Sequence, residues 1–259
     1  MSPPAPRPDG FAEALDSRGA EPPGAPVDRA AEPARRTVLT VLGTTAVVTA
    51  VSWLVPSFAA TGVGLVFLAA TWLTVLRHDE RTIRRHGLSL GGLLEPTPLD
   101  GRRIGRDLAL ALGLAALFAL VIFPPFWFGY VTYWGPKGTF VFRAPDSVAD
   151  EVLGQLLVTA LPEEAFFRGY LQTTLDAAWA PRWRILGADV GPGLVVSAAI
   201  FAVGHVLTVP NPARLAVFFP ALLFGWLRAR TGGIGSSVSF HAACNLFSAT
   251  LARGYGLVP

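Results

Sequence analysis

The chain has 259 residues, of which 52% are hydrophobic and only 15% are charged, and its formal net charge is +3. A soluble domain carries about 25% charged residues, so this composition excludes an ordinary water-soluble fold and favours an integral membrane protein. The small positive charge comes from arginines beside apolar runs, which is typical of membrane orientation and not of a nucleic-acid-binding surface.

The amino-terminal segment differs from the rest of the chain. Residues 1–36 hold eight of the 22 prolines, mix charges of both signs and contain no apolar run. The segment therefore lacks the apolar core of a secretory signal, and it cannot bury enough surface to fold. We expect a disordered cytoplasmic tail over residues 1–36.

Apolar runs near twenty residues long predict transmembrane helices through most of the remaining chain. The expected spans are 37–55, about 59–76, about 106–130, a fourth that begins near Ser147, about 192–208, 213–229 and about 235–251. The arginine clusters lie on one side of the membrane if there are seven spans and the amino terminus is cytoplasmic. These clusters are Arg35 with Arg36, the stretch Arg77–Arg106, Arg182 with Arg184, and Arg228 with Arg230. The expected fold is an all-α, polytopic transmembrane helix bundle of about seven spans.

The spans divide the chain into further segments. Residues 37–147 hold the amino-terminal helices and loops, 148–251 hold the last four helices, and 252–259 form a short tail. The proline- and arginine-rich, lysine-poor composition favours a high-GC bacterium, and with it the bacterial inner (plasma) membrane. The single cysteine, Cys244, excludes an intrachain disulfide, and we interpret it as a packing residue.

Few polar side chains lie deep within the expected spans. They are Glu163, Glu164, Arg168, His205, His241 and Asn245. A charged side chain costs about 2.5–3.5 kcal/mol at the centre of a membrane helix, so these groups are expected to meet inside the bundle. Glu164 and Arg168 are i, i+4 neighbours that can pair along one helix face, which leaves Glu163 facing elsewhere.

The same residue types indicate a chemistry. A carboxylate with an imidazole can activate water as a general base, and a second imidazole with a carboxamide can donate hydrogen bonds to an oxyanion. These are the groups that a hydrolase needs, and they are spread over the fourth, fifth and seventh expected helices.

Three short motifs follow one another in the sequence. They are Glu163-Glu164-x-x-x-Arg168, Phe201-x-x-x-His205 and His241-x-x-x-Asn245, with the surrounding words FFRGYLQ and RTGGIGSSVSFHAACN. In this order the motifs resemble those of the CAAX protease and bacteriocin-processing family of intramembrane endopeptidases, also called CPBP or Abi and including the type II CAAX prenyl endopeptidases. The likeness covers about 148–251.

The resemblance implies a membrane-embedded protease that cuts a membrane-associated protein or peptide, with 148–251 as its catalytic core. By match, Glu163 would activate the attacking water with His205, and His241 with Asn245 would stabilise the oxyanion. Glu164 and Arg168 would be supporting residues. No cofactor is expected. Zinc held by Glu163, His205 and His241 is the alternative, although the HExxH motif is absent.

Other classes of function stay open. A proton-coupled transporter would use Glu163 and His205 as carriers, and a non-catalytic scaffold or immunity protein would keep the fold without the reaction. The expected partners are the lipid bilayer and the substrate, without nucleic acid, and the sequence indicates no oligomeric state. Composition favours peptide maturation or surface-protein processing over prenylated substrates. Phe201 is expected to pack, and Tyr170 lies near the Glu163 face.

Overall fold

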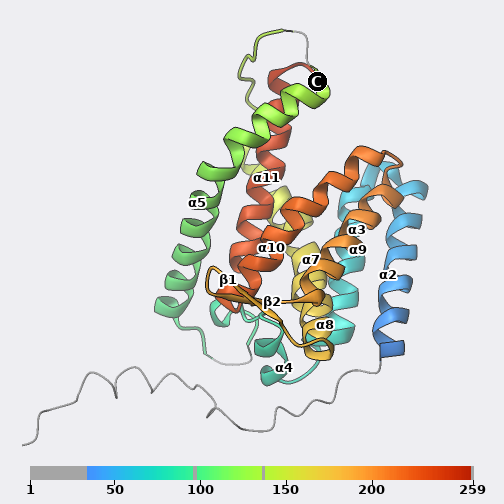
Figure 1. Ribbon diagram of the computed structural model, residues 1–259, viewed down its shortest axis with the longest axis vertical. Helices are drawn as coiled ribbons and strands as arrows, with labels where there is room; N and C mark the ends of the chain where they lie inside the picture. The colour runs from blue at the N-terminus through green and yellow to red at the C-terminus, as the bar shows by residue number, and fades with distance from the viewer. Residues whose placement is uncertain (1–33, 96–97, 136–137, 258–259) are drawn as a thin grey trace, which may run out of the picture. The chain divides into compact units, whose positions relative to one another are not determined.

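A computed structural model of the chain places a helix at each of the apolar runs (Figure 1). It describes residues 34–95, 98–135 and 138–257. The expected tail lies outside this part, except that Ala34 already begins the first helix. All described residues belong to one unit of the chain, Ala31–Pro259.

Helices make up most of the described chain, as expected from the sequence. The α-helices are α2 (Ala34–Leu54), α3 (Ala59–Thr71), α4 (Glu80–Arg85), α5 (Gly101–Trp134), α6 (Val148–Leu153), α7 (Leu161–Glu164), α8 (Thr173–Ala178), α9 (Pro192–Thr208), α10 (Phe218–Thr231) and α11 (Gly235–Gly254). Tighter 3-10 turns occur at Pro56–Phe58, Leu90–Gly92 and Pro212–Val217, and wider π-helical segments at Trp72–Leu76, Gly154–Ala160 and Ala165–Gln172.

The elements α6, α7 and α8 and the two π-helical segments between them form one unbroken helix, residues 148–178, called here the central helix. Ser147 begins it as a cap, because its hydroxyl accepts a hydrogen bond from the Asp150 backbone N–H. Pro162 lies inside the helix and supplies no N–H to the carbonyl of Val158. That carbonyl faces Gly64 of α3 so closely that a Cβ at Gly64 would overlap its oxygen. The missing side chain therefore lets α3 pack directly against the central helix.

The central helix lies inside the bundle. It packs against α3, α9, α10 and α11, while α2 covers α3 and α9, and α5 packs along α11 (Figure 1). Its most buried stretch, Ala160 and Pro162–Gln172, contributes to the main apolar core together with Phe67, Phe201 and Val238. Residues of the first, second and third motifs are thereby carried on three helices that touch.

Within residues 34–95, 98–135 and 138–257, three helices are long and apolar enough to cross a membrane. They are Arg35–Leu54, Pro56–Leu76 and Gly101–Tyr133, and Pro192–Thr208 is a shorter apolar helix. Only 22%, 22% and 11% of their apolar windows are buried inside the protein, so most of their surface is free to face lipid. The side chains exposed on α5 include Leu108, Leu112, Leu120 and Phe128. The chain is therefore an integral membrane protein, whereas the number of seven spans stays a prediction.

Some sequence-based expectations differ from the structure. The expectation of a purely α fold missed a small antiparallel hairpin of β1 (Trp183–Ile185) and β2 (Ala188–Val190). Its two turn residues both have positive φ, 46° at Leu186 and 80° at Gly187, as a tight two-residue hairpin turn requires. The third expected span, about 106–130, is longer in the structure, because α5 begins at Gly101, after the Asp100 cap, and continues to Trp134.

The basic loop after α3 is ordered around one buried acid. Glu95, whose side chain is fully buried, accepts hydrogen bonds from Arg103 at 2.8 and 3.0 Å and from Arg84 at 2.8 Å. These bonds join α4 to the start of α5. The loop then reaches the turn before α11, where the Ile234 N–H donates to the Gly87 carbonyl at 3.0 Å.

Candidate active site

The two adjacent glutamates lie in α7, in the middle of the central helix. The side chain of Glu164 is completely buried, and that of Glu163 is 11% exposed. Because consecutive helical residues point about 100° apart, the two carboxylates face different neighbours. Glu164 points into the interior, and Glu163 is the more exposed carboxylate of the pair, although its Oε2 is buried.

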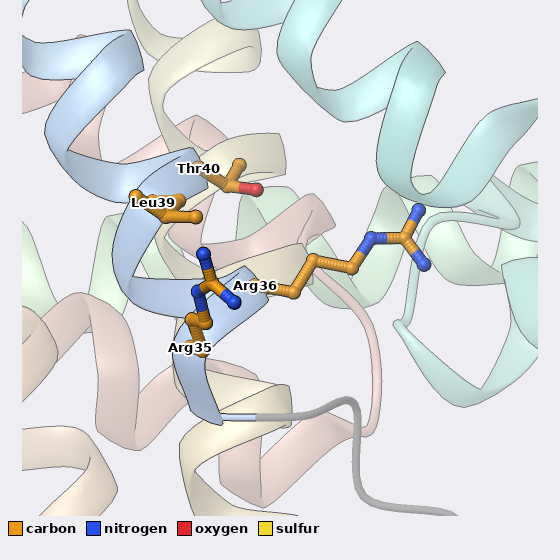
Figure 2. A pocket seen from close by; sticks show the side chains of 4 residues that line it. All are labelled: Arg35, Arg36, Leu39 and Thr40. Atoms are coloured by element: carbon orange, nitrogen blue, oxygen red, sulfur yellow. The ribbon is translucent and has the colours of Figure 1, made fainter.

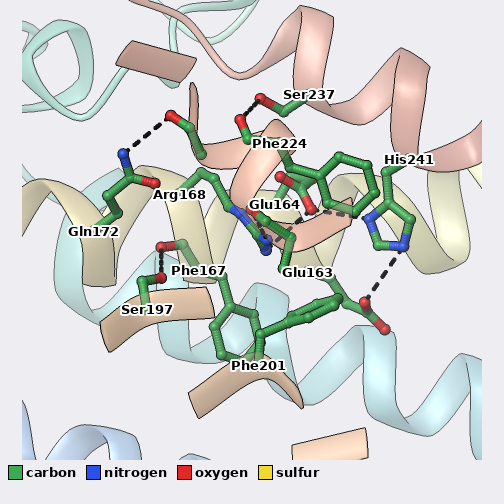
Figure 3. A network of polar contacts seen from close by, with 12 residues as sticks. Glu163, Glu164, Phe167, Arg168, Gln172, Ser197, Phe201, Phe224, Ser237 and His241 are labelled. Carbon is green, nitrogen blue, oxygen red and sulfur yellow. Dashed lines mark hydrogen bonds and ion pairs between the residues drawn. The ribbon is translucent and has the colours of Figure 1, made fainter. Parts of the chain in front are cut away.

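Glu164 contacts two nitrogen-bearing side chains, Arg168 and His241. Its Oε1 lies 3.2 Å from Arg168 Nη1 one turn along the helix, so the ion pair expected from the i, i+4 spacing is present. The same oxygen is 2.9 Å from His241 Nδ1 on α11 (Figure 3). Glu164 thus joins the first motif to the third, although the two are 77 residues apart.

Arg168 is a charged side chain with only 1% of its surface exposed. Besides Glu164 it contacts the carbonyl of Ala221 on α10, to which Nη2 donates at 3.0 Å. Its guanidinium carbon lies 4.6 Å from the centre of the Phe201 ring, a cation–π contact. A guanidinium stays protonated even here, so the Glu164 carboxylate is the countercharge that makes its burial tolerable.

His241 is the centre of the arrangement. Its Nδ1 meets Glu164, and its Nε2 lies 3.8 Å from Glu163 Oε2 (Figure 3). The imidazole stacks on Phe224, with ring centres 4.7 Å apart and planes 14° apart, and the edge of Phe201 lies 5.9 Å away. One carboxylate and two rings therefore fix the imidazole so that its other nitrogen faces the second carboxylate.

His205 lies beside this arrangement on α9. Its Nδ1 is 2.9 Å from the Phe201 carbonyl of its own helix, and its ring centre is 4.3 Å from that of Phe201. The contact with the carbonyl places the N–H on Nδ1 and leaves Nε2 as the unprotonated nitrogen of the neutral ring. The charge of Glu163 acts on this imidazole, but the structure brings His241, and not His205, to Glu163 as an ion-pair partner.

Asn245 has a partner that sequence reasoning missed. Its Nδ2 donates to Gln155 Oε1 at 2.9 Å, across from α11 to the central helix. The sequence could have indicated this partner, because Gln155 is an amide side chain within an apolar run, two helical turns before Glu163. Gln172, Ser197 and Ser237 are further buried polar groups missing from the expected set.

A zinc site needs at least three ligand side chains that converge on one point. Among the described residues, no group of three or more histidine, cysteine, aspartate or glutamate side chains is placed to hold a metal ion. Glu163, His205 and His241 are therefore not arranged as a ligand set, and no step below is routed through a metal.

Two surface hollows lie elsewhere on α2. One is lined by Arg35, Arg36, Leu39 and Thr40 (Figure 2). The other is an apolar groove along α2 that ends at Trp53, whose indole N–H donates to the Leu207 carbonyl at 3.0 Å. Neither hollow is lined by a residue of the three motifs, and neither offers the acid and base that hydrolysis needs.

The fold and the site together define a helical integral membrane protein in which an imidazole lies between two buried carboxylates. Comparison with protein families adds a specific match: residues 145–247 fit the family model described as type II CAAX prenyl endopeptidase Rce1-like. The match covers nearly the stretch on which the sequence resemblance rests, about 148–251. That family is a family of proteases. No curated protein and no solved structure matched the chain.

Proposed function

We propose that this protein is an intramembrane endopeptidase that hydrolyses a peptide bond of a membrane-associated protein or peptide. The observation that supports it best is the placement of His241, with Nδ1 2.9 Å from Glu164 and Nε2 3.8 Å from Glu163. Intramembrane ionisable groups are costly and mark functional sites, and this set combines a partly exposed carboxylate with an oriented imidazole.

In the proposed reaction Glu163 acts as the general base. It takes a proton from a water molecule as the water oxygen attacks the carbonyl carbon of the scissile bond, and His205 assists from the neighbouring helix. When His241 carries both protons, Nδ1–H donates to Glu164 and Nε2–H is left to stabilise the oxyanion, together with the amide of Asn245. Glu163 then returns the proton to the leaving nitrogen as the C–N bond breaks.

Glu164 and Arg168 have a supporting role in this proposal. Glu164 fixes the ring of His241 in the way that a buried carboxylate orients a catalytic histidine in other hydrolases. Arg168 in turn holds Glu164, because the ion pair keeps this carboxylate charged in a dry environment. No metal takes part in the proposed reaction, so a chelator would leave cleavage unchanged.

The test compares protein termini by mass spectrometry in cells that carry the wild type, Glu163→Gln or Asp150→Asn. The last variant is the matched control, because Asp150 is an exposed acid on the same helix. We expect a set of new termini in the wild type and the control that is absent from Glu163→Gln at equal membrane expression. Termini that persist in Glu163→Gln would contradict the proposal and favour a scaffold or transporter.

A further inference from the structure

The central helix carries a line of polar residues that continues beyond the motif. Glu164, Arg168, Gln172 and Asp176 follow one another at four-residue spacing, so they lie along one face of the helix. The first three are 0%, 1% and 2% exposed, and Asp176 is half-buried near the helix end. This column of four residues runs from the candidate site toward the end of the bundle that carries α4 and the hairpin (Figure 1).

The column faces α10 along its length. Arg168 donates to the carbonyl of Ala221, and Gln172 Nε2 donates to the carbonyl of Gly225 at 3.1 Å, one turn further along α10 (Figure 3). At the end of the column the charge of Arg228 acts on Asp176. Arg228 donates to the Arg85 carbonyl at 3.0 Å, at an exposed position. The column therefore begins at the protein surface and ends at Glu164.

Each member of the column leaves a buried atom without a protein hydrogen-bond partner. These atoms are Glu164 Oε2, Arg168 Nη1, Gln172 Oε1 and Asp176 Oδ1, and Arg228 Nε is a fifth. Arg168 Nη1 has its ion pair with Glu164, and the Asp176 carboxyl interacts with Gln172, whereas Glu164 Oε2, Gln172 Oε1 and Arg228 Nε have no hydrogen-bond partner among the described residues. A buried polar atom left without a partner costs more than a typical hydrogen bond contributes, and buried water ordinarily satisfies such atoms.

We propose that Glu164, Arg168, Gln172 and Asp176, with Arg228, line a file of buried water molecules that connects the protein surface to the candidate site. The side chains of the column carry more polar atoms than their contacts with α10 and with one another satisfy, and buried water is the ordinary partner of the remaining atoms. The ligand of this path is water itself. Combined with the proposed function, on which its purpose rests, the path supplies the reactant that hydrolysis needs inside a bilayer.

Radiolytic footprinting of the full chain in lipid nanodiscs tests the path without requiring cleavage. X-rays generate hydroxyl radicals from water in place, so a buried side chain beside bound water is oxidised while a dry one is not. Phe224 is the reporter, because its ring centre lies 5.3 Å from the Arg168 guanidinium carbon. Phe166 is the internal control, since it is also 1% exposed, lies on the central helix and packs on Phe67 instead.

We expect Phe224 to be oxidised faster than Phe166 in the wild type. Gln172→Met replaces the middle of the column with an apolar side chain of similar volume, and we expect oxidation of Phe224 to fall to the level of Phe166. Ser197→Ala is the matched variant, because Ser197 is also buried and its hydroxyl donates to Phe167 of the central helix, outside the column. It should leave Phe224 oxidation unchanged.

Equal oxidation of Phe224 and Phe166 in the wild type would overturn the proposal, and this comparison needs no variant to fold. Oxidation of Phe224 that is unchanged in folded Gln172→Met would overturn it as well. If Phe224 responds as expected while Glu163→Gln leaves all protein termini unchanged, the path stands and the proposed endopeptidase function fails.

Discussion

Replacing Glu164 by glutamine tests the electrostatic core of the site. The substitution removes the countercharge of Arg168, a guanidinium with 1% exposure, and leaves the shape of the side chain nearly unchanged. Removing one partner of a buried ion pair costs about 3–5 kcal/mol. A whole domain is stable by about 5–15 kcal/mol, so the variant should unfold far more readily than the wild type.

The double variant Glu164→Gln with Arg168→Leu separates charge from shape. Replacing a buried ion pair by well-packed hydrophobic residues of similar volume is often neutral or stabilising by about 1–4 kcal/mol in other proteins, and the double variant likewise leaves no unpaired buried charge at these two positions. We therefore expect the second substitution to recover most of the lost stability, but not cleavage, because His241 loses its carboxylate partner. The assay is unfolding of the purified protein in micelles, followed by helical circular dichroism. If Glu164→Gln alone lowers the free energy of unfolding by less than about 1 kcal/mol, as loss of an exposed ion pair would, Glu164 is not the countercharge on which the burial of Arg168 depends.

Three further predictions follow from other contacts. Gly64→Ala should destabilise the protein by about 1–3 kcal/mol, because its Cβ would overlap the Val158 carbonyl oxygen; thermal unfolding measures the loss. The hydrogen bonds from Arg103, above all, lower the pKa of Glu95 below its ordinary value of 4.5. The charged Glu95 carboxylate therefore stabilises the fold fully above pH 4.5, and this stabilisation is lost as the pH falls through the folded-state pKa. In Glu95→Gln, unfolding midpoints measured against pH should lack the part of the acid destabilisation that comes from Glu95. His241→Gln should lower the rate of cleavage by about 100- to 1000-fold, the usual cost of one oxyanion donor; a peptide assay that finds less than a tenfold loss would contradict that role.

Local spacing predicted the parts of the site that lie on one helix. Glu164 and Arg168 are one turn apart, so helical geometry alone predicted their ion pair, which the structure contains. The family resemblance brought the three motifs together, and the match over residues 145–247 agrees with it. It paired Glu163 with His205, whereas the structure brings His241 to both glutamates, a contact that depends on how α11 packs on the central helix.

Other features had no readable signal in the sequence. The partner of Asn245 is Gln155, 90 residues away, and neither side chain alone indicates the other. The hairpin strands, Trp183–Ile185 and Ala188–Val190, alternate apolar and polar residues, but three residues each are too few for the alternation to indicate a strand. The π-helical segments Gly154–Ala160 and Ala165–Gln172, on either side of Pro162, were not predicted from the sequence.

The most direct test of the account is a cleavage assay with purified protein in liposomes. The substrate is the protein whose terminus disappears in Glu163→Gln cells, and the reaction runs in water enriched in oxygen-18. We expect the wild type to cut the substrate and to place labelled oxygen in the new carboxylate. Glu163→Gln should yield no product, although its unfolding midpoint equals that of the wild type. Cleavage by Glu163→Gln at the wild-type rate would contradict the central claim that Glu163 activates the water.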